Sequence, residues 1–321
     1  MDNRSCISSC ELSLYIKGRM MEYAPVAIFT YNRPVHTKRL LECLAECEEL
    51  DKSHVRIYCD GPKHADHING VKETRRIISE IAPDHAKVVE RKNNLGLARS
   101  VITGVTELCD EYGRVIVLED DLVLSPHALS YLNNALNRYS EEDRVMHVSA
   151  YMYPVKAELS PSFFYREATC WGWATWARAW KYFEPDAEKL VNEIDEQGLR
   201  YEFNIEDSMY FYQMLCKQRD GVLDSWGIRW YASIFRRGGL ALHPPYSLVQ
   251  NLGFDGSGVH CNVDARFEVE LGKEPILQYP REIEESRAAI RAMIEYRCNT
   301  AEKVRMGPLR KRLRRFLGRF H

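Results

Sequence analysis

The sequence is short of net charge, of long apolar runs and of an export signal. Its formal net charge is -2 over 321 residues, which gives no overall attraction to nucleic acid. No stretch approaches the roughly 20 consecutive apolar residues of a transmembrane helix, and the N-terminus lacks the apolar core of a signal peptide. We therefore expect a cytoplasmic protein that binds no nucleic acid, folded as one large or two small domains.

Common nucleotide-binding and metal-binding signatures are also missing. A dehydrogenase would carry G-x-G-x-x-G after its first strand, where this chain has Thr-Tyr-Asn-Arg-Pro at 30–34, and the P-loop pattern is absent. The chain has 10 cysteines but no CxxC pair with partner histidines, so no zinc site is expected. Because the N-terminus carries no export signal, a disulfide framework is not expected either. Free thiols are predicted instead.

The most informative stretch is an apolar run that ends in three acids. Residues 115–118 are Val-Ile-Val-Leu, typical of a buried strand, and Glu119, Asp120 and Asp121 follow directly. An acidic triplet alone is more often a solvated loop. Here apolar residues also follow at 122–124, and burying three acids without compensation would be costly. A hard cation such as Mn2+ or Mg2+, shared with a substrate phosphate, would provide that compensation.

Apolar strand patterns recur along the first part of the chain. They lie at 26–30, 55–59, 86–89 and from 114, with amphipathic helical patterns between them. A strand about every thirty residues is the spacing of successive βαβ units. The sequence therefore predicts an α/β fold with a mostly parallel central sheet and helices on both faces.

Each predicted strand is followed by polar residues. Because the carboxyl ends of parallel strands meet at one edge of the sheet, these side chains should converge where a nucleotide binds. Asp60 alone is about as well explained as a turn residue before Gly61, and Arg33 alone as a surface charge; the common location favours a site. The candidates are Thr30, Arg33, Asp60, Asn94, Arg99, Glu119, Asp120 and Asp121.

The second half of the chain offers weaker candidates. Trp176 and Trp180 are expected in the core, whereas Trp171 and Trp173 beside Gly172 suit either the core or an apolar wall for sugar rings. Asp224 precedes a helical pattern and is equally well explained as its N-cap. The glycine-rich stretch 251–260 fits either a lid or an ordinary surface loop.

Seven segments between roughly residues 24 and 262 form a recognisable series. In chain order they are PVAIFTYNRP, NLGLARS, VIVLEDDL, RVMHVSAY, CWGWATWARAW, DSWGIRWYASIF and SLVQNLGFDGSGVHC. Together, and in this order, they resemble the bacterial glycosyltransferases of the GT-A fold. The part containing Glu-Asp-Asp is also similar to N-acetylglucosaminyltransferase I.

This resemblance implies roles for individual residues in donor binding. Asp121 matches the acid that ligates the metal on the donor diphosphate, and Glu119 and Asp120 match contacts to ribose or sugar. Asp60 matches the acid that hydrogen-bonds uracil, and Arg33 matches a phosphate or nucleotide contact. Thr30, Asn94 and Arg99 are further donor-binding candidates.

The resemblance also implies two residues of the second half. In inverting relatives an acid in the segment that matches residues 224–230 deprotonates the acceptor hydroxyl, and Asp224 is the match here. Related sequences often place this acid after the tryptophan, where this chain has Gly227. His260 would complete the metal site, as a late histidine does in many relatives.

The expected domain plan divides the chain into five parts. A leader (1–23) precedes the nucleotide-sugar-binding half (24–125) and the acceptor or catalytic half (126–262) of the GT-A domain. A helical extension (263–307) and a basic amphipathic tail (308–321) follow. The tail has apolar residues on one helical face and arginines elsewhere, which favours contact with an anionic membrane surface at the inner membrane face over a solvated or partner-docking helix.

The sequence therefore predicts a metal-dependent, inverting glycosyltransferase of bacterial surface polysaccharide or glycan synthesis. It would move a sugar from a nucleotide-diphosphate sugar, with UDP favoured, to a hydroxyl of a saccharide or lipid-linked acceptor. Two alternatives stay open: a sugar nucleotidyltransferase, which would release pyrophosphate, and a non-catalytic nucleotide-sugar-binding protein on the same scaffold.

Overall fold

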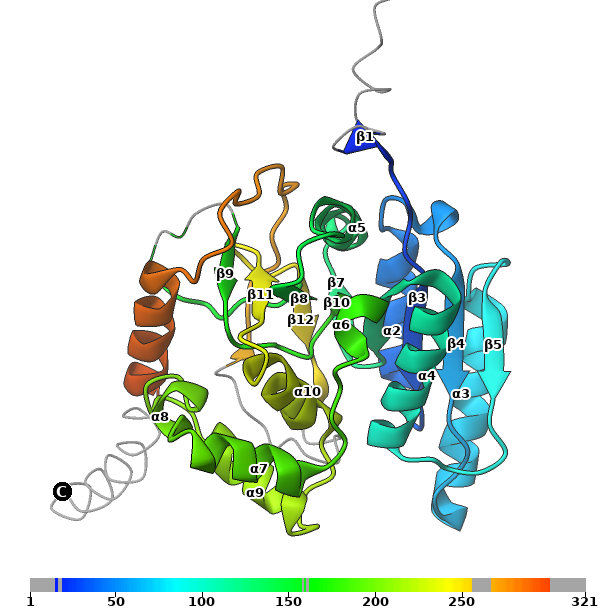
Figure 1. Cartoon of the computed structure of the whole chain (residues 1–321). Coiled ribbons are helices and arrows are strands. Elements are labelled where there is room, and N and C mark those ends of the chain that lie inside the picture. Colours follow the sequence, from blue (N-terminus) through cyan, green and yellow to red (C-terminus); the bar gives the residue numbers. More distant parts are fainter. Residues whose placement is uncertain (1–14, 17–18, 158, 160–161, 256–266, 301–321) are drawn as a thin grey trace, which may run out of the picture.

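A single eight-stranded sheet forms the centre of the computed structural model (Figure 1). The structure describes the chain except residues 1–14, 17–18, 158, 160–161, 256–266 and 301–321. The strand order is β5-β4-β3-β6-β10-β8-β11-β9. In chain order the strands are β3 (Val26–Thr30), β4 (Val55–Cys59), β5 (Lys87–Glu90), β6 (Arg114–Glu119), β8 (Val145–Ser149), β9 (Phe163–Tyr165), β10 (Trp173–Trp176) and β11 (Leu240–His243).

Strand direction divides the sheet into two regions. The four strands of the first half, β5, β4, β3 and β6, are all parallel to their neighbours. Beyond β6, β10 pairs antiparallel with both β6 and β8, β11 is parallel to β8, and β9 closes the edge antiparallel to β11. The predicted α/β class with a mostly parallel sheet is confirmed, and the antiparallel insertion of β10 is a feature that strand spacing did not predict.

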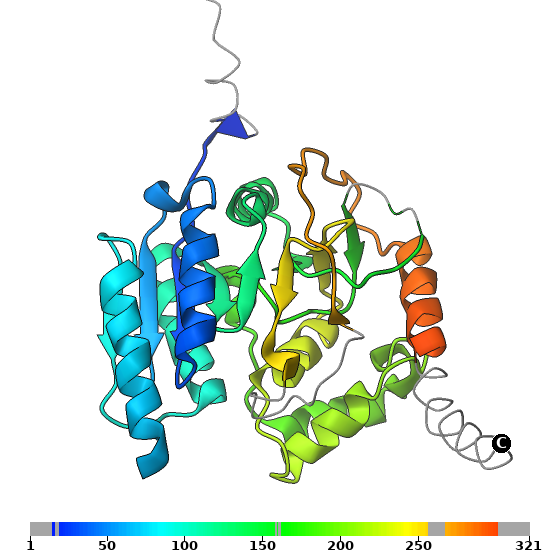
Figure 2. The ribbon, with the colours of Figure 1, turned by 180° about the vertical axis from the view of Figure 1, so that it is seen from behind.

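Helices cover both faces of the sheet, as predicted (Figures 1 and 2). One face packs mainly against α2, α3 and α5, and the other against α4, α6 and α10. Residues 287–300 form a further helix at the far side of the molecule, close to β9 and α8. The helices are α2 (Pro34–Ala45), α3 (Ile68–Ile81), α4 (Leu97–Tyr112), α5 (Ala128–Arg138), α6 (Ala177–Trp180), α7 (Ala187–Glu196), α8 (Arg200–Phe203), α9 (Phe211–Arg219) and α10 (Trp226–Phe235).

The apolar spacing of the sequence explains most of this packing. Leu40, Leu41 and Leu44 of α2 are buried, because residues three or four apart lie on one helical face. Pro34 occupies the first turn of α2, where its missing N–H costs no hydrogen bond. Ile81 and Leu97 are 36% and 46% exposed although they are apolar, since each stands at a helix end.

Two small sheets and three single helical turns complete the described structure. Antiparallel pairing of β7 (Leu122–Leu124) with β12 (Val249–Asn251) brings a late segment back to the end of β6. β1 (Tyr15–Ile16) and β2 (Arg19–Met20) pair near the N-terminus. The turns are 3-10 helices at Leu50–Lys52, Ala65–His67 and Gly253–Asp255.

The helix at 287–300 is attached to the body through a buried ion pair. Arg297 bonds to Glu167 with side-chain exposures of 7% and 5%, and its guanidinium lies over the Tyr153 ring at 4.9 Å. Arg297 also donates to the Tyr165 hydroxyl at 3.2 Å, while the Tyr153 hydroxyl donates to Glu167 at 2.9 Å. The region around β9 is therefore held by charge as well as by apolar contact.

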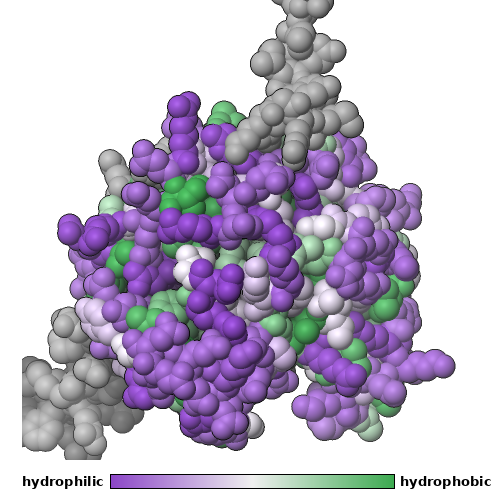
Figure 3. Space-filling view, in the orientation of Figure 1, coloured by the Kyte–Doolittle hydropathy of each residue, from purple (hydrophilic) through white to green (hydrophobic). Residues whose placement is uncertain are grey.

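One face of the molecule is mostly polar (Figure 3), and the described cysteines are unpaired. The face in Figure 3 is predominantly hydrophilic, with small separate apolar areas. None of the helices in the described residues is long and apolar enough to cross a membrane. Cys43, Cys47, Cys59, Cys109, Cys170, Cys216 and Cys298, the cysteines that the structure describes, are free thiols. The basic tail from 308 lies outside the described residues.

Candidate active site

Three parallel strands end side by side at one edge of the sheet. Phe29 of β3 pairs with Glu119 of β6, and the Asp120 backbone N–H donates to the Phe29 carbonyl at 3.1 Å. On the other side of β3, the Asp60 backbone N–H donates to the Thr30 carbonyl at 3.0 Å. The polar residues after β3, β4 and β6 therefore emerge together.

Arg33 lies directly on the acids. Its Nη1 donates to Asp121 Oδ2 at 2.8 Å and reaches Asp120 Oδ1 at 3.4 Å. The side chains of Arg33, Asp120 and Asp121 are only 19%, 10% and 12% exposed, so this is a largely desolvated group. The other carboxylate oxygen of Asp120 accepts the backbone N–H of Tyr31 at 3.1 Å, which fixes the turn between β3 and α2.

Burial and mutual repulsion make this edge strongly attractive to cations. Burial, followed by the charge of Asp121, raises the pKa of Asp120 to about 7. Burial and the two neighbouring carboxylates raise the pKa of Glu119 well above its usual range. Burial alone would lower the pKa of Arg33, but the charges of Asp120 and Asp121 outweigh it and raise that pKa. A positive charge is needed here to keep the acids ionised.

One carboxylate atom of this group has the properties of a metal ligand. Asp121 Oδ1 is buried and has no hydrogen-bond partner among the described residues, which is costly for an acceptor unless something else binds it. A hard divalent cation with oxygen ligands fits that atom. Within the same residues no three His, Cys, Asp or Glu side chains form a ready-made cluster.

A late segment of the chain borders the same carboxylate. Because β12 pairs with β7, Asn251 lies opposite Leu122, and the Leu252 N–H donates to the Asp121 carbonyl at 2.8 Å. A Cβ on Gly253 would lie 2.2 Å from Asp121 Oδ2, so any side chain here would have to displace that carboxylate or shift the loop. The glycine-rich stretch 251–260 is evident in the sequence, but its approach to Asp121 is not.

Asp60 binds the backbone of the neighbouring loop. It is 4% exposed, and its carboxylate accepts the N–H groups of Gly61, Leu95 and Gly96 at 3.0 to 3.1 Å. Asn94 reinforces this junction by donating to the Gly61 carbonyl at 2.8 Å. These bonds use most of the acceptor capacity of the carboxylate and hold the 94–96 loop at the end of β4.

The side chains of the remaining first-half candidates bond elsewhere than to the acids or stand exposed. Thr30 is 4% exposed, and its hydroxyl donates to the Tyr58 carbonyl at 3.4 Å. Arg99 stands exposed on the first turn of α4, and in the described part of the chain no ion pair includes it. Tyr31, which the sequence did not single out, contacts the acids through its backbone N–H, which donates to Asp120 Oδ2, while its hydroxyl bonds to His67 Nδ1 at 2.6 Å.

Asp224 lies at the start of α10 and not within the acid group. Its side chain is 70% exposed and accepts from Arg229 at 3.1 Å. The alternative role as N-cap is wrong, because the cap is Ser225, whose hydroxyl accepts the Ile228 N–H. His260 lies outside the described residues.

The start of α10 packs against Cys170. A Cβ on Gly227 would meet Cys170 Sγ at 3.4 Å. Burial, followed by the charge of Glu119, raises the pKa of the Cys170 thiol to about 12.

The tryptophan-rich block is mostly core. Trp176 and Trp180 are 2% and 5% exposed, as predicted. Trp173 is fully buried, stacked on Trp226 and on His147, so its proposed place in a sugar-binding wall is wrong. Its position on β10, between β6 and β8, directs the indole into the core. Trp171 is half-buried and packs edge-on against Phe254 and Phe267.

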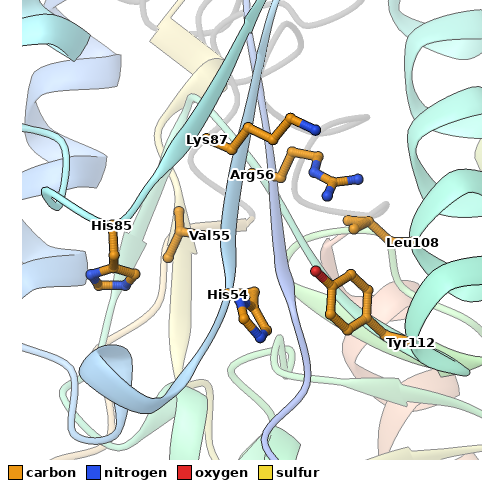
Figure 4. Close-up of a pocket in the computed structure, with 7 residues that line it drawn as sticks. All are labelled: His54, Val55, Arg56, His85, Lys87, Leu108 and Tyr112. Atoms are coloured by element: carbon orange, nitrogen blue, oxygen red, sulfur yellow. The ribbon is translucent and has the colours of Figure 1, made fainter.

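A cavity lies at the opposite edge of the sheet from the acids (Figure 4). It measures about 130 Å³ and sits where β4 and β5 begin, away from the acids that follow the strand ends. Although it is lined by basic groups, Arg56 already pairs with Glu107 and Glu111 at 2.8 and 3.0 Å. The lining residues are His54, Val55, Arg56, His85, Lys87, Leu108 and Tyr112.

Comparison with known families covers the part of the chain that carries this site. Residues 26–152 match the family model described as glycosyl transferase family 2. The match includes Arg33, Asp60 and the three acids, so the part of the chain that carries the site is similar to a glycosyltransferase family, in line with the predicted class of enzyme. The predicted likeness to N-acetylglucosaminyltransferase I stays a prediction. No curated protein matches the sequence.

Two solved structures show weak similarity to the chain. One is the mannosyltransferase PcManGT from Pyrobaculum calidifontis in complex with GDP-Man and Mn2+, with 15% identity and a TM-score of 0.33, covering 55% of this chain and 47% of that one. The other is S. aureus TarS, with 17% identity and a TM-score of 0.30, covering 44% of this chain and 23% of that one. The chain thus spans about half the length of the first and a quarter of the second.

Proposed function

We propose that this chain, whose residues 26–152 match glycosyl transferase family 2, transfers a sugar from a nucleotide-diphosphate sugar to a hydroxyl of a saccharide or lipid-linked acceptor. The observation that carries the proposal is the orphaned, buried Asp121 Oδ1 at the carboxyl end of β6. It lies in the family-matched region, beside two further acids, where an open α/β sheet binds its ligand.

Each residue of the site has a separate task in this proposal. Asp121, with Asp120 next to it, would hold Mn2+ or Mg2+, which when bound neutralises negative charge on the departing diphosphate. Arg33 provides a guanidinium whose fork suits phosphate oxygens. Asp60 fixes the 94–96 loop around the nucleotide base, since its oxygens are engaged by backbone N–H groups.

The finer parts of the proposal rest on resemblance and on local chemistry. A UDP-sugar donor follows from the match at Asp60. Inversion at the anomeric centre follows from Asp224 acting as base, whose 70% exposure leaves it accessible to an acceptor. His260 is proposed as a further metal ligand, and Thr30 and Arg99 as donor contacts. The basic tail is proposed to lie on anionic lipid, with a role in bacterial surface glycan synthesis on the cytoplasmic side.

A panel of nucleotide sugars tests the function directly. We expect one of the UDP-, GDP-, CMP- and dTDP-sugars, with Mn2+, to raise the melting temperature and to be slowly hydrolysed by the purified protein. Both effects should disappear in EDTA and in Asp121→Asn, and persist in Asp110→Asn, which removes an exposed acid of α4. Release of pyrophosphate from a nucleoside triphosphate would instead indicate a nucleotidyltransferase. Binding without turnover of any donor, with acceptors supplied, would indicate a binding protein.

A further inference from the structure

We infer that Arg33 is an internal counter-ion: it neutralises the acid pair in the free protein and competes with the divalent cation for it until a diphosphate binds. This inference rests on the proposed function, because it assumes that Asp121 holds a metal. It goes further by making one side chain responsible for coupling between metal and donor. The protein without donor should accordingly bind the metal weakly. A diphosphate should strengthen metal binding in two ways: its oxygens add ligands, and they also draw the Arg33 guanidinium away from the acids.

The geometry supports competition for the same charge. A single nitrogen, Arg33 Nη1, contacts Asp121 Oδ2 at 2.8 Å and Asp120 Oδ1 at 3.4 Å. These carboxylates are nearly desolvated, so leaving them without a cation would be costly. The remaining oxygen, Asp121 Oδ1, is buried and unpartnered among the described residues. The site therefore has its charge balanced by arginine while one ligand atom stays open.

A guanidinium and a divalent cation do not share this carboxylate favourably. Two positive groups at one nearly buried acid repel each other strongly, because screening by water is small there. Entry of the metal must therefore displace Arg33 or bring additional negative charge. A diphosphate does both, since its oxygens bind the metal and also accept the guanidinium in a bidentate manner.

The backbone at Arg33 allows its side chain to change partner without loss of the helix. Arg33 is the N-cap residue of α2, with non-helical φ and ψ of -134° and 71° and no capping bond from its side chain. Regular helical structure begins only at Pro34. The guanidinium can thus be released from the acids while α2, which carries buried Leu40, Leu41 and Leu44, stays in place.

Binding of Mn2+ to the donor-free protein tests the inference. The free ion is measured by its electron paramagnetic resonance signal in titrations of wild type, Arg33→Gln and the matched control Arg39→Gln, which removes the same charge from an exposed position of α2. We expect Arg33→Gln to bind Mn2+ about tenfold or more tightly, a difference of about 1.4 kcal/mol. Arg39→Gln should bind like wild type.

A second arm uses inorganic pyrophosphate as the diphosphate probe. By thermodynamic linkage, pyrophosphate should increase the Mn2+ affinity of wild type by a larger factor than that of Arg33→Gln. An equal factor in both proteins, or unchanged or weaker Mn2+ binding by Arg33→Gln, would overturn the inference. If Arg33→Gln does not fold, the wild-type titration decides: Mn2+ binding that is equally tight without pyrophosphate overturns it, and a marked dependence supports it.

Failure of the proposed function gives a different result. If wild type binds no Mn2+ even with pyrophosphate or nucleotide diphosphates, the metal-dependent site itself is refuted, and the inference with it. If wild type binds Mn2+ and turns over a donor, but Arg33→Gln shows no gain in affinity, only the role of Arg33 as internal counter-ion is refuted.

Discussion

Removal of Arg297 should destabilise the protein far more than removal of an exposed arginine. The change is Arg297→Met, which keeps the length of the side chain and deletes its charge. It breaks the pair with Glu167 and the contacts with Tyr153 and Tyr165. The comparison is Arg200→Met, whose pair with Asp195 has side-chain exposures of 57% and 33%.

The exposed fractions of the paired side chains determine how much stability each variant should lose. With side chains only 7% and 5% exposed, loss of Arg297 leaves Glu167 as an uncompensated buried charge, which costs about 3–5 kcal/mol. The Tyr153 hydroxyl still donates to Glu167, which keeps the expected cost toward the lower end of that range. Loss of the exposed Arg200 pair should cost little by comparison, because water screens it.

Urea unfolding of the single variants and of a double variant measures this difference. In Arg297→Met with Glu167→Gln, the orphaned charge is gone, so the double variant should recover about half or more of the loss. The reasoning is refuted if Arg297→Met costs no more than Arg200→Met. It is equally refuted if the two changes at the buried pair are simply additive, because that would mean the charges do not interact.

Three further predictions concern residues at and behind the site. Burial, with the charge of His243, lowers the pKa of His147 to about 3, so only the unfolded chain takes up this proton below about pH 6.5. As the pH is lowered from about 6.5 toward 3, this residue should therefore reduce the free energy of unfolding by about 1.4 kcal/mol per pH unit. In urea unfolding between pH 6 and 4, the free energy of unfolding of His147→Gln should depend on pH less steeply than that of wild type, by this amount. Asp60→Asn should lower the free energy of unfolding by about 1–3 kcal/mol, because it weakens bonds to three backbone N–H groups; unchanged stability would restrict Asp60 to ligand contact. Gly253→Ala should displace the Asp121 carboxylate and weaken Mn2+ binding in the presence of a nucleotide diphosphate, whereas wild-type affinity would show that the loop yields instead.

The sequence predicted the first half of the fold well because that half is built from local patterns. Strands at 26–30 and 55–59 coincide with β3 and β4, since strands buried on both faces are continuously apolar. Placement of β10 was beyond such reasoning. Trp173–Trp176 has a composition that suits any buried segment, and its insertion between β6 and β8 depends on pairing between distant parts of the chain.

At the candidate site, too, the sequence indicated which residues take part but not how their side chains contact one another. The sequence indicated that Arg33 and the acids share one edge of the sheet, because each follows a strand. It gave no indication that the guanidinium would rest on Asp120 and Asp121, since a side-chain partner is not encoded in strand order. The approach of Gly253 to Asp121 was likewise hidden, because it depends on the pairing of β12 with β7.

The position of β10 has a consequence for the order in which the newly made chain can fold. When residues 26–152 have left the ribosome, β3 to β6 can pair with one another, but the outer edge of β6 still lacks Trp173–Trp176. β8 has been made by then as well, yet both of its neighbours, β10 and β11, come later in the chain. An open apolar edge invites pairing with other chains. The segment that matches the family model is thus the one most dependent, during synthesis, on sequence that has not yet been translated.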